Sequence, residues 1–210
     1  MPLKKSKLKV KKMNNCETRF FACEVRADAK EEITRISGYG SVFSKRSENL
    51  GGFREVIAPG AFDSVLNDDV RAFFNHDHNF ILGRSTNGTL RLSVDDEGLR
   101  YEIDAPQTQT IRDLVLAPMQ RGDINQSSFA FRVSRDGEEW AEDDEGVVVR
   151  TIHKMQRLFD VSPVSMPAYP DAGSAVRSMG VWQEARDSGI IKKSVNEKRS
   201  RERFLELIRN

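Results

Sequence analysis

Short runs in which apolar and polar residues alternate dominate the chain. This pattern predicts β-strands, because successive side chains of a strand point to opposite faces. The clearest case is a pair of alternating runs, 89–94 and 99–103, whose connection DDEG is a turn sequence; together they predict a hairpin. Similar runs occupy residues 19–25, 33–42, 53–57, 70–76, 127–133, 147–152 and 156–164.

Two helices are predicted between these strands. A short one covers residues 61–66, after a Pro-Gly breaker. A longer one covers 108–121, with apolar residues at helical spacing, Thr110 as its N-cap and Pro118 as the position of a break or kink. Six to eight short, mostly antiparallel strands with one or two inserted helices predict an α+β protein built as a small β-barrel with peripheral helices.

The remaining polar stretches predict connections and tails. Residues 77–79 (DHN) are typical of a turn, and the acidic stretch 136–145 predicts a loop. We expect a basic flexible tail over 1–15, one domain over 16–175 and a charged helical tail over 176–210.

The composition excludes several classes of protein. The chain has 210 residues and a formal net charge of +1, which gives no overall signature of nucleic-acid binding. No apolar run approaches the roughly 18 residues of a membrane span, and no apolar signal segment follows the six lysines of the first twelve residues. Two cysteines are too few for a disulfide framework, so a reducing, cytoplasmic setting fits best.

The stretch GDINQSSFAFRV (122–133) contains the first candidate for chemistry. Alternation places Ser127 on the face of Phe129 and Phe131, the natural core face, and Ser128 on the opposite, solvent side. A serine there is a nucleophile only if a base reaches it. Otherwise it is an ordinary surface serine of a strand.

The candidate base lies upstream, in VRAFFNHDHNFILGR (70–84). His76 would end a strand anchored by its inner residues, and His78 follows in the predicted turn. Histidine is suited to proton transfer near neutral pH. The alternatives are local hydrogen bonding of both histidines, or a metal-dependent hydrolase built on His76, Asp77 and His78, for which no third ligand pattern is evident.

Four stretches together resemble one family. They are FREVIAPGAF (53–62), FNHDHNFILGR (74–84), GDINQSSFAF (122–131) and LFDVSPVSMPAY (158–169). In this order they are similar to the prohead proteases of tailed bacteriophages, the capsid maturation proteases. The resemblance implies a serine endopeptidase whose fold, a closed β-barrel with surrounding helices, is similar to that of the herpesvirus assemblins.

The resemblance also implies roles for individual residues. The family's base matches His76, and its nucleophile, the serine directly before F-x-F, matches Ser128. Ser127 stands where the family usually has an apolar residue, which leaves it as an alternative nucleophile. For the third member, Asp160 between two apolar residues would orient an imidazole. The assemblins use a second histidine instead, for which His153 is the candidate, and a water or backbone group is a further alternative.

The implied substrates are the phage scaffold or the scaffolding segment of the major capsid protein, cut inside the procapsid in the host cytoplasm, with self-cleavage also expected. No cofactor or metal is implied, and a homo-oligomer is left open. Three other hypotheses stand beside this one: the metal-dependent hydrolase, a non-enzymatic capsid assembly or scaffold protein that retains the fold, and phosphate binding by the basic tail.

Overall fold

The computed structural model describes residues 16–21, 25–28, 34–166, 180 and 183. The tails expected over 1–15 and 176–210 therefore lie almost wholly outside the described residues. The strands are β1 (Glu17–Phe21), β2 (Val25–Asp28), β3 (Arg35–Val42), β4 (Phe53–Ile57), β5 (Arg71–Phe74), β6 (Asp77–Arg84), β7 (Leu90–Val94), β8 (Gly98–Asp104), β9 (Gln126–Val133), β10 (Glu138–Glu142), β11 (Val148–Ile152) and β12 (Met155–Val164). The helical turns are η1 (Ser85–Asn87), α1 (Gln109–Ile111), η2 (Arg112–Leu116) and α2 (Ala117–Gln120).

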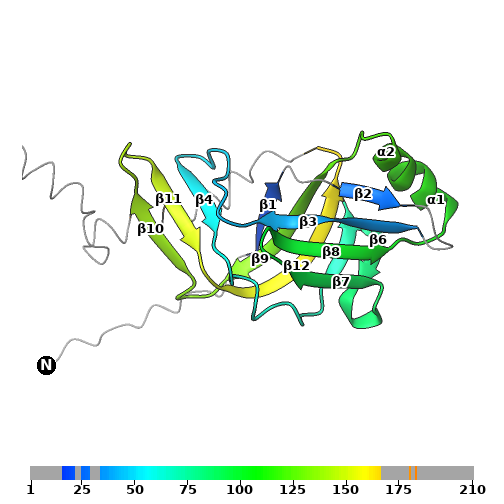
Figure 1. The fold of residues 1–210 in the computed structure, drawn as a ribbon, viewed down its shortest axis with the longest axis horizontal. Helices are drawn as coiled ribbons and strands as arrows, with labels where there is room; N and C mark the ends of the chain where they lie inside the picture. Colours follow the sequence, from blue (N-terminus) through cyan, green and yellow to red (C-terminus); the bar gives the residue numbers. More distant parts are fainter. Residues whose placement is uncertain (1–15, 22–24, 29–33, 167–179, 181–182, 184–210) are drawn as a thin grey trace, which may run out of the picture.

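These strands form three sheets (Figure 1). Their strand orders are β1-β9-β12-β5-β6, β10-β11-β4 and β2-β3-β8-β7. The pairs β12–β5 and β11–β4 are parallel and the other pairs are antiparallel, as expected of a mostly antiparallel protein.

The predicted closed barrel of six to eight strands needs correction. The described residues contain more strands than that, and none of their three sheets closes on itself. The sheets are joined through side chains instead: one hydrophobic cluster takes residues from β3, β4, β8, β9 and β12 together. Packing of apolar faces therefore holds the sheets together here, as a closed hydrogen-bond ladder holds the strands of a barrel together.

Most predicted strands are confirmed. The hairpin appears as β7 and β8, and the run 53–57 is β4. The predicted loop 136–145 is wrong, because Glu138–Glu142 pairs with β11. There Trp140 packs on Phe53, with ring centroids 4.9 Å apart, so tertiary contacts override the acidic composition.

The helix predictions are partly confirmed. Helical turns occupy 109–120, but the N-cap is Thr108, whose side chain accepts a hydrogen bond from Ile111, and not Thr110. The middle of this segment is a π-helix that leads up to Pro118, a residue with no N–H to donate. The predicted helix 61–66 is wrong: this stretch forms a series of turns, too short to nucleate an α-helix.

The turn segment after β4 nevertheless anchors the core beneath β9. Phe62 is fully buried, and its ring meets those of Phe129 and Phe43 at centroid distances of 5.6 and 6.1 Å. Phe129 in turn stacks on Phe131, 4.7 Å away. These ring contacts hold the apolar face of β9 against the core. The side chains on the opposite face of β9 are thereby held in position as well.

We predict that Phe62→Ala lowers the free energy of unfolding by about 3–5 kcal/mol, because it leaves a cavity under β9. Leu114→Ala, at a side chain that is 50 % exposed, is the control and should cost less than about 1 kcal/mol. Denaturant titration of both variants measures the difference. Equal losses would show that Phe62 does not anchor the core.

Candidate active site

The candidate base lies in a tight turn between β5 and β6. Phe74 pairs with Asp77, so the chain reverses through only two residues, Asn75 and His76. Both have positive φ, 55° and 57°, as the two central residues of a type I′ hairpin turn require. The turn predicted at 77–79 is therefore wrong, since these residues begin β6, and His76 does not extend β5.

The side chain of Asn75 ties this turn to the end of β12. Its Oδ1 accepts a hydrogen bond from the backbone N–H of Ser165 at 2.8 Å, and its Nδ2 donates to the Ser165 hydroxyl at 3.1 Å. The backbone N–H of Asn75 donates to the carbonyl of Pro163 at 3.0 Å. A left-handed backbone is costly outside glycine, and these bonds hold His76 in it.

The candidate nucleophile is set by the pairing of β9 with β12. Ser128 lies opposite Ser162, and a bulge between Leu158 and Asp160 adjusts the register beside them. As the alternation predicted, Ser127 faces the core, where its hydroxyl lies 2.7 Å from the Tyr101 hydroxyl. Ser128 points to the other face.

On that face three side chains form a chain of hydrogen bonds. Nε2 of His76 lies 2.5 Å from Oγ of Ser128, and Nδ1 lies 2.6 Å from Oδ1 of Asp160. Ser162 donates to the same carboxylate oxygen at 2.8 Å. With Nδ1–H donated to Asp160, Nε2 is left as an acceptor for the serine proton. This is the order of groups that activates a serine.

The Ser128 hydroxyl has a second acceptor. The backbone carbonyl of Arg19, on β1, lies 2.9 Å from its Oγ. Ser128 is also fully buried, so the expectation of a solvent-side serine was wrong. Ser128 is buried because β1, a strand distant in sequence, pairs with the outer edge of β9.

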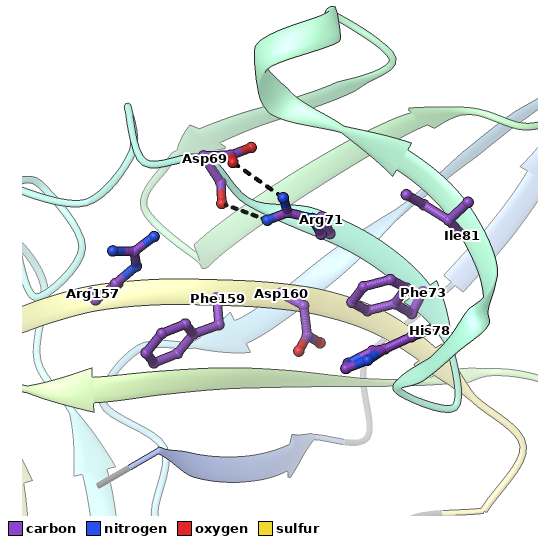
Figure 2. Close-up of a pocket in the computed structure, with 8 residues that line it drawn as sticks. All are labelled: Asp69, Arg71, Phe73, His78, Ile81, Arg157, Phe159 and Asp160. Atoms are coloured by element: carbon purple, nitrogen blue, oxygen red, sulfur yellow. Dashed lines mark hydrogen bonds and ion pairs between the residues drawn. The ribbon is translucent and has the colours of Figure 1, made fainter. Parts of the chain in front are cut away.

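A shallow depression of about 440 Å³ opens beside the carboxylate end of this chain of groups (Figure 2). Its walls come from β5, β6 and β12, with Asp160 on one side and the rings of Phe73 and His78 close by. His78 packs on Phe73, with centroids 4.8 Å apart, and is not in the chain of hydrogen bonds described above.

The alternative third residue, His153, lies elsewhere. It is about half exposed between β11 and β12, and its Nε2 lies 3.6 Å from a carboxylate oxygen of Glu139. The structure thus brings Ser128, His76 and Asp160 together, and it leaves His153 and Ser127 apart from them.

Comparison with known proteins places the chain in a family. The model described as caudovirus prohead serine protease matches residues 21–184, well over half of the chain. The chain belongs to this family of prohead serine proteases. A protease role in capsid maturation follows from that membership. No curated protein and no solved structure matches the chain. In the part of the chain that the structure describes, no helix is long and apolar enough to span a membrane.

Sequence reasoning missed the residues that support this candidate site. Ser162, two residues after Asp160, shares its face of the strand, so alternation alone could have indicated a hydrogen bond to the carboxylate. Asn75 gave a weaker signal, since asparagine is among the residues that tolerate positive φ. Nothing local indicated Ser165, whose partner lies 90 residues away.

We predict that Asn75→Gly slows the reaction of Ser128 with a fluorophosphonate about tenfold, because glycine keeps the turn but loses its bonds to β12. Mass spectrometry of the labelled chain gives the rate. Asn79→Gly, four residues along at the start of β6, is the control and should change the rate less than about twofold. Equal rates for Asn75→Gly and the unaltered chain would contradict a positioning role for Asn75.

Proposed function

We propose that the chain is a serine endopeptidase in which Ser128 is the nucleophile, His76 the general base and Asp160 the group that orients the imidazole. The observation that carries this proposal is the continuous hydrogen-bond chain Ser128–His76–Asp160, made by three elements distant in sequence. The family match supports the reaction class independently of that geometry.

The reaction is acyl transfer. Oγ of Ser128 attacks the carbonyl carbon of the scissile peptide while Nε2 of His76 takes the serine proton. The Asp160 carboxylate accepts the Nδ1–H and stabilises the imidazolium that forms. The imidazolium then protonates the leaving amine. A water molecule, deprotonated by the same imidazole, releases the acyl group from Ser128.

The substrates we propose are the scaffold or the scaffolding segment of the major capsid protein, cut inside the procapsid in the host cytoplasm. Family membership supports this choice. The chain itself is a further substrate. A non-enzymatic role in capsid assembly is the alternative, and it predicts that Ser128 is dispensable.

Co-expression with the major capsid protein tests the function. We expect intact mass to show a truncated capsid protein with the unaltered chain and a full-length one with Ser128→Ala. Ser127→Ala is the matched control, one residue away on the opposite face, and should leave cleavage in place. Truncation with every variant would assign the cut to another protease, and full-length protein throughout would favour the assembly role.

For Asp160→Asn we predict a loss of about 10³–10⁴ in the rate of cleavage, because an amide does not hold the imidazole in the required tautomer. Asp104→Asn, which alters a strand carboxylate bound by Arg91 in another sheet, should change the rate by less than about threefold. Single-turnover cleavage of the capsid protein by both variants measures this. A similar loss in both would point to general destabilisation.

A further inference from the structure

Strand β1 lies at the edge of the five-stranded sheet, next to the candidate nucleophile. It runs antiparallel to β9, with Phe20 opposite Ser128. The part of the chain that matches the protease family begins at residue 21, so nearly all of β1 precedes it. The strand thus covers the outer edge of the strand that presents the candidate nucleophile.

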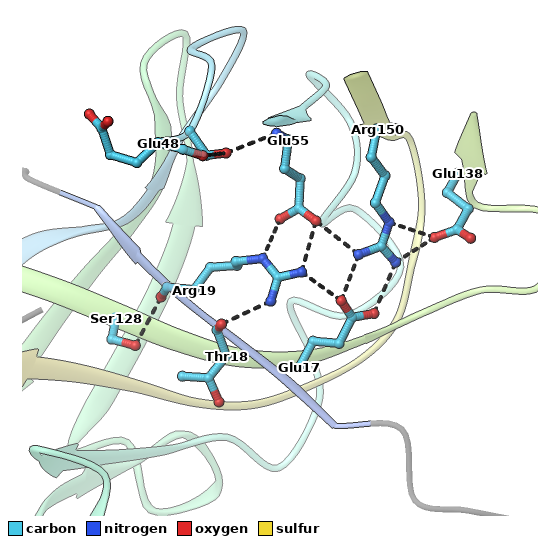
Figure 3. Close-up of polar contacts among 9 residues, drawn as sticks. Glu17, Thr18, Arg19, Glu48, Glu55, Ser128, Glu138 and Arg150 are labelled. Carbon is cyan, nitrogen blue, oxygen red and sulfur yellow. Dashed lines mark hydrogen bonds and ion pairs between the residues drawn. The ribbon is translucent and has the colours of Figure 1, made fainter. Parts of the chain in front are cut away.

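The backbone of β1 presents a peptide carbonyl to Ser128. The carbonyl oxygen of Arg19 is the one that lies 2.9 Å from Oγ of the serine (Figure 3). Extended peptides commonly bind proteins by adding a strand to an exposed sheet edge. An extended substrate on β9 in this register would place the carbonyl of the residue equivalent to Arg19 at the nucleophile.

The side chain of Arg19 is bound by a buried carboxylate. It is 3 % exposed, and its guanidinium donates to both oxygens of Glu55, at 2.8 and 3.0 Å. Such a two-pronged bond fits the planar guanidinium and discriminates strongly against neutral side chains. Glu55 belongs to β4, in a different sheet, and lies inside the family-matched region.

Glu17, two residues earlier on the same face of β1, is bound by a buried guanidinium. Its carboxylate accepts two hydrogen bonds from Arg150, at 2.6 and 2.9 Å. Burial raises the pKa of Glu17, but the bonds and charges of Arg150 and Arg19 outweigh burial and leave the pKa below its ordinary value. Arg150 also binds Glu55 and Glu138, as Figure 3 shows.

Without β1, the fixed part of this cluster would be Arg150, Glu55 and Glu138, with one positive and two negative charges. Arg150 would keep its bonds to Glu55 and Glu138, but Glu55 would lose the guanidinium of Arg19, so these groups favour an occupant with a basic residue at that position. In β1 the acidic residue two positions earlier on the same face accepts from Arg150 and, at 2.7 Å, from Arg19 itself, which adds a place for an acidic residue to the pattern.

We propose that β1 occupies the peptide-binding groove as a substrate-like strand, and that Glu55 and Arg150 select peptides of the pattern Glu-x-Arg for cleavage after the arginine. This inference rests on the proposed protease function. Oγ of Ser128 bonds to the arginine carbonyl carbon, and the C–N bond to the next residue breaks as His76 protonates the amine. Water then releases the arginine carboxylate.

The first test measures occupancy of the groove in the full chain. Glu17→Gln with Arg19→Gln removes the charges that seat β1, and we expect Ser128 to react with a fluorophosphonate about tenfold faster or more. Arg100→Gln with Glu102→Gln is the matched control, an exposed pair of the same residue types at the same spacing on β8, and should leave the rate unchanged. An unchanged or slower rate in the β1 variant overturns the inference. No labelling of Ser128 in any variant overturns the protease function itself.

The second test measures selection, in the same double variant of β1, which carries Glu17→Gln and Arg19→Gln. The probe is a quenched peptide of residues 14–23 with serine in place of both cysteines, compared with a copy that has glutamine in place of arginine. We expect kcat/KM at least about tenfold higher for the arginine peptide. Adding Glu55→Gln should bring the ratio near one, while Glu139→Gln, at an exposed carboxylate on β10, should not.

The inference is overturned if the two peptides are cut at equal rates before Glu55 is altered. It is also overturned if the preference for the arginine peptide survives Glu55→Gln. Failure to cut either peptide when Ser128 is labelled overturns it as well. Because the result is a ratio within one protein, partial loss of folding in the Glu55 variant does not imitate it.

Discussion

The pairing of β9 with β12 is the constraint on which the site depends. It fixes Ser128 opposite Ser162, so the proposed nucleophile and the hydroxyl that binds Asp160 lie across one ladder. β12 then pairs in parallel with β5, and the turn after β5 presents His76. A slip of one residue in either pairing would turn these side chains to the core face. The register that packs these strands is therefore also the register that brings the three side chains of the site together.

Much of this arrangement was accessible from sequence, because it depends on local alternation. The two faces of 127–133 separate Ser127 from Ser128 without any structural information, and the core rings of Phe129 and Phe131 lie where the pattern predicts. The position of the turn between β5 and β6 could not be predicted from sequence. Residues 77–79 have the more turn-like composition, but the reversal occurs at Asn75 and His76 because bonds to β12, far along the chain, hold their backbone there.

The larger departures from the predictions have one origin in non-local contacts. The acidic stretch around Trp140 forms a strand because it meets Phe53 and Arg150, and neither is a sequence neighbour. Ser128 is buried because of a strand more than 100 residues upstream. Buried ion pairs such as those of Arg150 contribute little net stability, since desolvation opposes their attraction. Their value to this molecule lies in which segments they bring together.

The position of β1 also bears on how copies of this protein treat one another. With β1 in place, β9 is paired on both sides over residues 127–131. If β1 were displaced, a row of N–H and C=O groups would be exposed along β9, and such an edge is a template for strands of any neighbouring chain. Crowding many copies together would then favour strand exchange between them. A bound strand of its own removes that template from each copy until another peptide takes its place.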